Sequence, residues 1–349
     1  MIGILPNSND FSHPQDRRRY LYYLESNNIE YELADFSKVY EVLYVSLNCD
    51  LNLWSQYKKI NNLHHVKIIF DLSDNYLADT PVRSFLRSIG HFLIGRTRSL
   101  CSSYKKSILK MLEVADIVTA GSDEQREVIS RYTRAKVIVA RDYFFEFDEY
   151  LPIHKSTTCD DEVSIVWEGF SHSLFKIYKF FWLISSGQRL KGVKKVSLYF
   201  VTDTRMCRFF GSVLCTSVER HLSKKLNLDN VTVSVLDWTV ENLVDAVSKS
   251  DFAIIPLPND PISRSKPENK VMLFYYLKIP VLCSDIPSYR RVMQDSFNEK
   301  FICSSILEWE GAIELLKYDN DKYIQNSSKY VAEKLSMKNY IEFWSKIFL

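Results

Sequence analysis

Residues 251–293 read DFAIIPLPNDPISRSKPENKVMLFYYLKIPVLCSDIPSYRRVM, and this stretch decides the fold class. The apolar run 252–257 is bounded by prolines and predicts a buried strand. A polar loop follows, and Pro267 then favours a helix start, because proline lacks the N–H group that a first helical residue leaves unpaired. Residues 281–283 predict a second buried strand. Strand, helix and strand in this order indicate a parallel sheet.

Lys266 and Lys270 flank the start of the helix expected at Pro267. Ligands of open parallel sheets bind at the carboxyl ends of the strands, and a helix N-terminus favours anions. We therefore expect a small-molecule ligand that carries phosphate. A structural interpretation stays open, in which Glu268 complements the helix dipole, Asn269 is a turn residue and the lysines are solvated.

The composition is that of a globular protein with two domains. The 349 residues suit two domains of about 150 residues each, and the net charge of +2 argues against a nucleic-acid binder. Seven cysteines form no Cys-x-x-Cys pair and no zinc-type spacing with histidine, which is typical of reduced intracellular proteins. No signal-peptide pattern opens the sequence, and no apolar run approaches the roughly 20 residues that span a bilayer. We expect a cytoplasmic protein.

Two series of alternating strands and helices predict two doubly wound parallel sheets, an α/β fold. Strands of the first series are expected at 2–5, 29–34, 42–47, 66–71, 117–120 and 136–140. Its helices are expected at about 14–26, 51–62, 80–114 and 123–132. Strands of the second series are expected at 163–167, 196–201, 231–236, 252–257, 281–283 and 301–303. The polar stretch 149–162 separates the series, so we expect domains at 1–150 and 163–336 and a terminal helix at 337–349.

The stretch quoted above resembles the donor-binding half of GT-B glycosyltransferases, above all the retaining, family 4-like enzymes that use nucleotide sugars. The matching segments are DFAIIPL (251–257), KPENK (266–270), IPVL (279–282) and SDIPSYRR (284–291). Two positions depart from the pattern. Leu273 stands where many relatives have a glutamate that holds the donor ribose, and Lys278 stands where a glycine is usual.

The resemblance implies two Rossmann-like domains that face a central cleft, with the acceptor on the first domain, the donor on the second and a terminal helix that crosses back. It implies a glycosyltransferase of polysaccharide biosynthesis that moves a sugar, with retention, from a nucleotide sugar to a hydroxyl of a glycan or lipid-linked acceptor. The donor-binding residues that it implies are Glu168, Gly169, Ser171, His172, Trp238, Thr239, Ser265, Lys266, Glu268, Asn269 and Lys270.

The residue types fit these roles, and each also has an ordinary structural interpretation. Only nine glycines occur, and none forms Gly-x-Gly-x-x-Gly or a Walker loop, so side-chain cations and helix termini must hold any phosphate. Gly169 lets a backbone approach a ligand closely, while His172 and Lys176 can meet phosphate. Alternatively, Ser171 caps a helix. Trp238 can stack on a base, or it can belong to the core. No Asp-x-Asp motif follows a strand, so we expect no metal and no other cofactor.

The loop after the first strand carries the candidate acceptor-site residues. His13 and Asp16 can bind or deprotonate an acceptor hydroxyl, and Asp71 and Asp74, at the end of another strand, compete for that role. The structural alternative is that Ser12 caps a helix from residue 14, that Asp16 suits its dipole, and that the arginines at 17–19 lie on the surface.

Residues 82–112 contain seven lysines and arginines and no acidic residue, with large apolar residues between them. Such a segment can lie on an anionic membrane or meet a lipid-linked acceptor. A solvated face on a long buried helix explains the pattern as well.

Two other functions stay open. A degenerate GT-B protein could bind a nucleotide or a partner without turnover, a function that Leu273 favours. A nucleotide-sugar epimerase could use the same architecture, but no motif supports it.

Overall fold

The computed structural model of the chain describes residues 1–63, 65–153, 161–171, 173–174, 177–178, 180–181, 193–207, 215–226 and 229–349. The chain forms two compact units. Unit 1 comprises Met1–Tyr143, Arg264–Asn269 and Leu335–Leu349, and unit 2 comprises Phe144–Ser263 and Lys270–Lys334. Each unit has its own six-stranded parallel sheet and its own buried core.

The sheet of unit 1 has the strand order β2-β1-β3-β4-β5-β6, and every pair is parallel. Its strands are β1 (Ile2–Leu5), β2 (Tyr31–Leu33), β3 (Val42–Val45), β4 (Lys67–Leu72), β5 (Ile117–Ala120) and β6 (Lys136–Val139). All four residues of β3 are buried, as expected for a parallel sheet covered on both faces. Strand β1 is the topological switch point, because the chain continues to β2 on one side of it and to β3 on the other.

Two helices expected in unit 1, at 51–62 and at 80–114, are each divided into two in the structure. They are α1 (Pro14–Asp16), a π-helical turn (Arg17–Leu21), α2 (Tyr22–Ser26), α3 (Leu51–Trp54), α4 (Tyr57–Ile60), α5 (Pro81–Leu93), α6 (Tyr104–Val114), α7 (Asp123–Ile129) and α14 (Met337–Phe348). The single helix expected over 80–114 is wrong, because α5 ends at a C-terminal motif that reverses the chain. Gly95 has φ +73°, its N–H donates to Phe92 O at 3.1 Å, and Arg96 N–H donates to His91 O at 2.9 Å.

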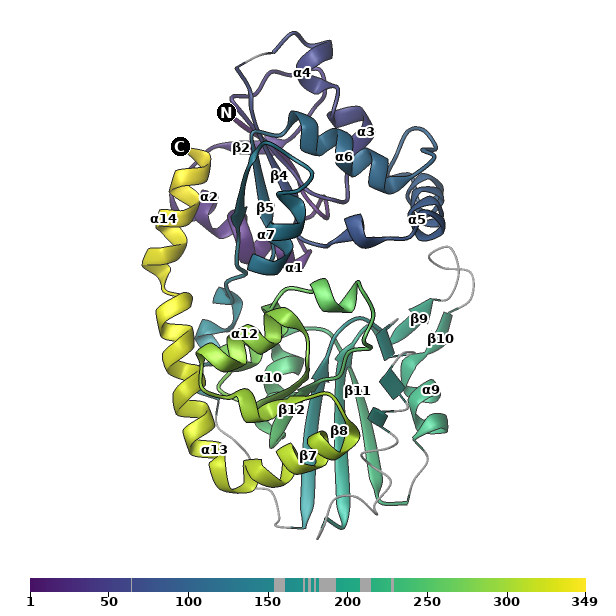
Figure 1. Cartoon of the computed structure of the whole chain (residues 1–349), viewed down its shortest axis with the longest axis vertical. Helices are drawn as coiled ribbons and strands as arrows, with labels where there is room; N and C mark the ends of the chain where they lie inside the picture. The colour runs from purple at the N-terminus through teal and green to yellow at the C-terminus, as the bar shows by residue number, and fades with distance from the viewer. Residues whose placement is uncertain are drawn as a thin grey trace. The chain divides into compact units, whose positions relative to one another are not determined.

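Helix α14, at the end of the chain, completes the core of unit 1 and lies beside α2 (Figure 1). Tyr340 donates its hydroxyl hydrogen bond to Arg19 O and accepts one from Tyr23 N at 2.9 Å. Phe348 stacks on Tyr23 with ring centroids 6.0 Å apart, and Trp344 is fully buried. The last helix is therefore part of the first core although it follows the whole of unit 2 in sequence.

The sheet of unit 2 has the strand order β11-β8-β7-β12-β13-β14, again with parallel pairs only. Its strands are β7 (Glu162–Glu168), β8 (Lys195–Thr202), β11 (Val231–Asp237), β12 (Phe252–Ile255), β13 (Val281–Ser284) and β14 (Ile302–Cys303). A small antiparallel hairpin, β9 (Arg205–Cys207) with β10 (Cys215–Ser217), was not predicted. The switch point of this sheet lies at β7, between β8 and β12.

The described helices of unit 2 are α9 (Val218–Lys225), α10 (Val240–Ser248), α11 (Asn269–Tyr276), α12 (Pro287–Asp295) and α13 (Ile306–Lys334), with the first residue of α11 grouped with unit 1. Helix α11 begins two residues after the expected Pro267, and α13 was not predicted. The predicted fold class, two doubly wound parallel sheets, is confirmed. The domain boundaries stay a prediction. Among the described residues, no helix combines the length and apolarity needed to cross a membrane.

Candidate functional site

The switch point of unit 2 brings Gly169 and Lys270 together. Gly169 directly follows β7, and Lys270 lies in the first turn of α11, the helix reached from the neighbouring strand β12. Lys270 Nζ donates to Glu168 O at 2.5 Å. The crevice at such a switch point is where open α/β sheets bind ligands. The sequence predicted both residues as donor-binding, and the structure makes them neighbours.

Gly169 leaves the space that the lysine needs. Its φ of +155° is rare for residues with a side chain, and a Cβ at this position would lie 2.4 Å from Lys270 Nζ. The same Cβ would lie 3.0 Å from the ring of Trp167, and Lys270 Nζ lies 5.4 Å from the centroid of that ring. A larger residue at 169 would therefore displace the ammonium group.

Glu168 connects the lysine to Trp238, which follows β11. Its carboxylate lies 3.2 Å from Lys270 Nζ and accepts a hydrogen bond from Trp238 Nε1 at 2.9 Å. The Lys270 side chain is 31% exposed. The indole N–H of Trp238 thus positions Glu168, a contact that the sequence analysis did not predict.

The other predicted donor-binding residues of unit 2 have local structural contacts. Ser171 donates to Asp203 Oδ2 through its N–H at 3.2 Å and its hydroxyl at 3.0 Å. Thr239 caps α10, because its hydroxyl accepts from Asn242 N at 3.1 Å. His172 lies outside the described residues, and so does Lys176. Their predicted roles stay predictions.

The rest of the KPENK segment groups with unit 1. Glu268 is buried, and its Oε1 lies 3.4 Å from Arg141 Nε. Asn269 donates to Asp142 Oδ2 at 2.6 Å. Ser265 ends a 3₁₀ turn, and Lys266, which follows it, is partly exposed. Leu273, the departure noted above, is buried within α11.

His13 lies in the loop after β1, at the switch point of unit 1. Its side chain caps α1, because Nδ1 accepts from Gln15 N at 3.3 Å. Burial lowers the pKa of His13 below its usual 6.5, and this effect outweighs the nearby carboxylates, Asp74 among them, which raise it. A neutral imidazole whose Nδ1 accepts carries its proton on Nε2, so this side chain is built to donate a hydrogen bond.

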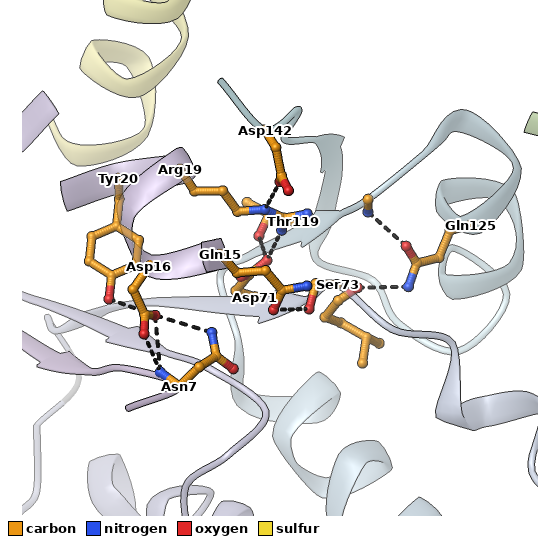
Figure 2. A network of polar contacts seen from close by, with 12 residues as sticks. Asn7, Gln15, Asp16, Arg19, Tyr20, Asp71, Ser73, Thr119, Gln125 and Asp142 are labelled. Carbon is orange, nitrogen blue, oxygen red and sulfur yellow. Dashed lines mark hydrogen bonds and ion pairs between the residues drawn. The ribbon is translucent and has the colours of Figure 1, made fainter. Parts of the chain in front are cut away.

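Asp16 is held inside the same loop. Asn7 N donates to both of its oxygens at 3.0 Å, and Ser8 N and Tyr20 Oη donate at 3.1 and 3.0 Å. The side chain is fully buried, and burial raises the pKa of Asp16 although these hydrogen bonds lower it. Figure 2 shows Asp16 directed into the loop toward Asn7 and Tyr20. These contacts shape the loop that carries His13.

A buried ion network was missed by the sequence analysis. Arg19, expected on the surface, is fully buried between two carboxylates, with Nη1 at 2.5 Å from Asp71 and Nε at 2.8 Å from Asp142 (Figure 2). Thr119 donates its hydroxyl hydrogen to Asp71 at 2.7 Å. Burial opposes the charge on Arg19, but the two aspartates raise its pKa overall. Asp71 and Asp142 both lie at the carboxyl edge of the sheet, and this position was the signal from which the network could have been predicted.

The contacts of Asp71 with Arg19 and Thr119 give it a structural role, whereas Asp74 is partly exposed. Asp74 Oδ2 accepts from the hydroxyl of Tyr76 at 3.0 Å. No group of three or more potential metal ligands occurs among the residues that the structure describes. The predicted catalytic roles of His13, Asp16 and Asp74 stay predictions.

Among the comparisons with known proteins, only the one with solved structures gives matches. No protein-family model matches the sequence, and no curated protein is significantly similar to it. Solved structures do match. Sucrose-phosphate synthase from Thermosynechococcus elongatus has a TM-score of 0.59 at 11% identity, over 88% of this chain and 73% of the other. A trehalose-6-phosphate protein from E. coli, bound with UDP-2-fluoro glucose, has 0.58 at 11% identity, over 88% and 74%.

A third similar structure is TarM from S. aureus, solved with fondaparinux, α-GlcNAc-glycerol and UDP, with a TM-score of 0.55 at 15% identity. The match covers 94% of this chain and 57% of that one. At such identities the likeness concerns the fold. The predicted resemblance is confirmed at that level: the chain has two Rossmann-like domains and resembles GT-B glycosyltransferases.

Proposed function

We propose that the chain is a glycosyltransferase that moves a sugar, with retention, from a nucleotide sugar to a hydroxyl of a glycan or lipid-linked acceptor. Polysaccharide biosynthesis is the process that we propose for it. Unit 2 would bind the donor and unit 1 the acceptor. Two of the similar structures hold UDP or a UDP-sugar analogue, so UDP-sugars are the donors that we would test first.

One observation carries the proposal: a glycine with positive φ and a partly exposed lysine meet at the switch point of unit 2. Gly169 provides a close backbone approach, and Lys270 provides a cation at the N-terminus of α11. Diphosphate needs both, because its oxygens take hydrogen bonds from backbone N–H groups and its charge needs a counter-ion. Lys270 would turn from Glu168 to the diphosphate when the donor binds.

The same cation would assist the reaction. As the bond between the sugar and the diphosphate breaks, negative charge grows on the leaving phosphate, and a fixed ammonium group stabilises it. The acceptor oxygen forms the new bond to the sugar as the bond between the sugar and the diphosphate breaks, and its proton passes to a carboxylate, for which we propose Asp74. His13, with its proton on Nε2, would donate a hydrogen bond to a substrate oxygen and orient it. Asp74 is partly exposed and suits the role of proton acceptor, whereas Asp16 is buried and shapes the loop.

The remaining predicted residues support this assignment as proposals. Trp238 would hold Glu168 in place, and Ser171 and Thr239 would fix the two loops that follow β7 and β11. We propose that Lys270 neutralises the charge of the diphosphate, so that the reaction needs no metal and no other cofactor. We also propose membrane contact through residues 82–112. It is a separate proposal, because none of the proposed donor-binding or catalytic residues lies in that segment.

Turnover of a donor panel tests the proposal. The full chain is incubated with UDP-, GDP-, TDP- and ADP-sugars and with glycan and polyprenyl-phosphate-linked acceptors, and release of the nucleotide is measured. Gly169→Ala should weaken donor binding and turnover, because a Cβ would strain a backbone with φ +155° and block the close approach of the diphosphate. Gly311→Ala in α13 is the matched control, since a Cβ there meets nothing within 4 Å. Absence of binding to every nucleotide sugar would refute the proposal.

A binding protein without turnover is the second candidate, and Leu273 favours it. This residue is 1% exposed and apolar where the resemblance places a ribose-binding glutamate. The same panel separates the candidates. Saturable nucleotide-sugar binding that Gly169→Ala weakens, without consumption of any donor with any acceptor, would identify a binding module.

A further inference from the structure

Helix α5 (Pro81–Leu93) turns its apolar side outward. Val82, Leu86 and Leu93 are 67%, 59% and 57% exposed, and Phe85 and Phe92 are exposed too. At 3.6 residues per turn these five side chains fall within a stripe of roughly 120° along one side of the helix. Ile94 and Leu100, which follow the helix in sequence, are exposed as well. Large apolar side chains thus gather on one exposed surface.

Small polar side chains occupy the opposite side of α5, the side that packs on unit 1. Ser84 is buried, and its hydroxyl lies 2.9 Å from that of Ser103. Ser88 is buried as well and donates its hydroxyl hydrogen to Cys101 O at 2.7 Å. Hydrogen bonds therefore anchor the helix where apolar contacts would ordinarily do so.

Arg87 and His91 complete this inner side. The guanidinium group of Arg87 lies 3.8 Å from the ring centroid of Tyr76 and bonds to Asp79 at 3.0 Å. The imidazole ring of His91 packs on Tyr104 with centroids 4.6 Å apart. A surface helix of a globular protein ordinarily buries its apolar side and exposes its polar side. Helix α5 does the reverse, and so its apolar stripe is available to a ligand outside the fold.

The charged residues of the segment that contains α5 are of one sign. Residues 82–112 contain no Asp or Glu. The exposed cations of this segment are Arg83, Arg96, Arg98, Lys106 and Lys110. An exposed apolar stripe in a segment whose charged residues are all cations matches a surface that is negative outside and apolar beneath. An anionic lipid bilayer has that layered chemistry.

We propose that α5 is the membrane-docking element of this protein and lies in the plane of an anionic bilayer surface. Its apolar stripe enters the boundary between headgroups and acyl chains, and the neighbouring cations contact the headgroups. The polar anchors on unit 1 keep the helix formed and correctly turned before it meets the membrane. This proposal does not depend on sugar transfer.

Vesicle co-sedimentation of the full chain tests the apolar half of the proposal. Wild type should bind phosphatidylcholine vesicles that contain phosphatidylglycerol and bind pure phosphatidylcholine much less. Leu86→Gln with Leu93→Gln should weaken that binding at least tenfold, since both side chains lose apolar burial while glutamine preserves the helix. Leu307→Gln is the matched control, because Leu307 is 71% exposed on α13. Circular dichroism should be the same for all variants.

Two further variants test the contribution of the cations by neutralising one charge each. Arg83→Gln and Arg98→Gln should each weaken binding to the anionic vesicles about fivefold, and added salt should do the same. Lys224→Gln on α9 is the matched control. Equal binding to both vesicle types, or wild-type binding by the leucine variant, would overturn the proposal. So would a dimer in sedimentation velocity that the leucine variant dissociates without any vesicle binding, because the stripe would then be a protein interface.

Discussion

Removal of the Lys270 ammonium group should weaken binding of the nucleotide-sugar donor. In the free protein this group is held by Glu168 O at 2.5 Å and by the Glu168 carboxylate at 3.2 Å. When a diphosphate replaces the carboxylate, the lysine makes a charge-assisted contact worth about 1.5–3 kcal/mol, or about tenfold to a hundredfold in Kd. Lys270→Ala should therefore raise Kd by that factor.

We expect the effect to lie at the upper end of this range. Without the lysine, Glu168 keeps the Trp238 indole as its partner and presents an uncompensated negative charge to the phosphates. Glu168→Gln in the Lys270→Ala background removes that repulsion while the amide oxygen still accepts from the indole. The double variant should recover about tenfold of the lost affinity, a coupling that a double-mutant cycle measures.

Titration calorimetry with the full chain and its donor gives the four Kd values. The melting temperature should hardly change, because Lys270 is partly exposed and a lysine in the first turn of α11 is not favoured by the helix dipole. Lys278→Ala, after the other end of α11, is the matched control and should bind normally. If Lys270→Ala binds the donor like wild type and keeps its melting temperature, the phosphate site lies elsewhere and the reasoning is refuted.

Three further predictions follow from other parts of the chain. Arg19→Met leaves Asp71 and Asp142 buried without their cation, so urea unfolding should show a loss of about 3–5 kcal/mol; a loss below about 1 kcal/mol would contradict the network. Burial lowers the pKa of His91 to about 4, so the unfolded chain binds this proton more readily, and the free energy of unfolding should rise between about pH 4 and 6.5. His91→Phe, which keeps the ring contact with Tyr104, should flatten that rise; an unchanged slope would exclude His91 as its source. Turnover should survive a chelator, and a loss that manganese restores would show that a metal is needed.

The elements and their order could be predicted from the sequence because the signals are local. Strands 2–5 and 117–120 were predicted with the bounds that β1 and β5 have. Apolar runs of four to six residues, separated by amphipathic segments, specify buried parallel strands wherever they occur in a chain. The prediction of one helix over 80–114 was wrong because it overlooked a local signal. Gly95 ends α5, and the composition of the segment does not reveal that end.

Part of the candidate site could also be predicted. KPENK follows a strand and opens a helix, so the topology of open parallel sheets already placed Lys270 at a ligand-binding edge. The sequence did not reveal that the ammonium group of Lys270 fills the space beside Gly169. This contact depends on the pairing of β7 with β12, which brings together residues about a hundred positions apart.

The burial of Arg19 and the outward orientation of the apolar side of α5 were decided by the tertiary structure alone. Arg19 belongs to a run of three arginines that predicts a solvated surface, yet two aspartates from distant strand ends enclose it. Helix α5 has an ordinary amphipathic sequence, and the usual rule would bury its apolar side. The hydrogen bonds of Ser84 and Ser88 turn that side outward instead. A sequence determines which side of a helix is apolar, but which side meets the core depends on partners that only the completed fold brings near.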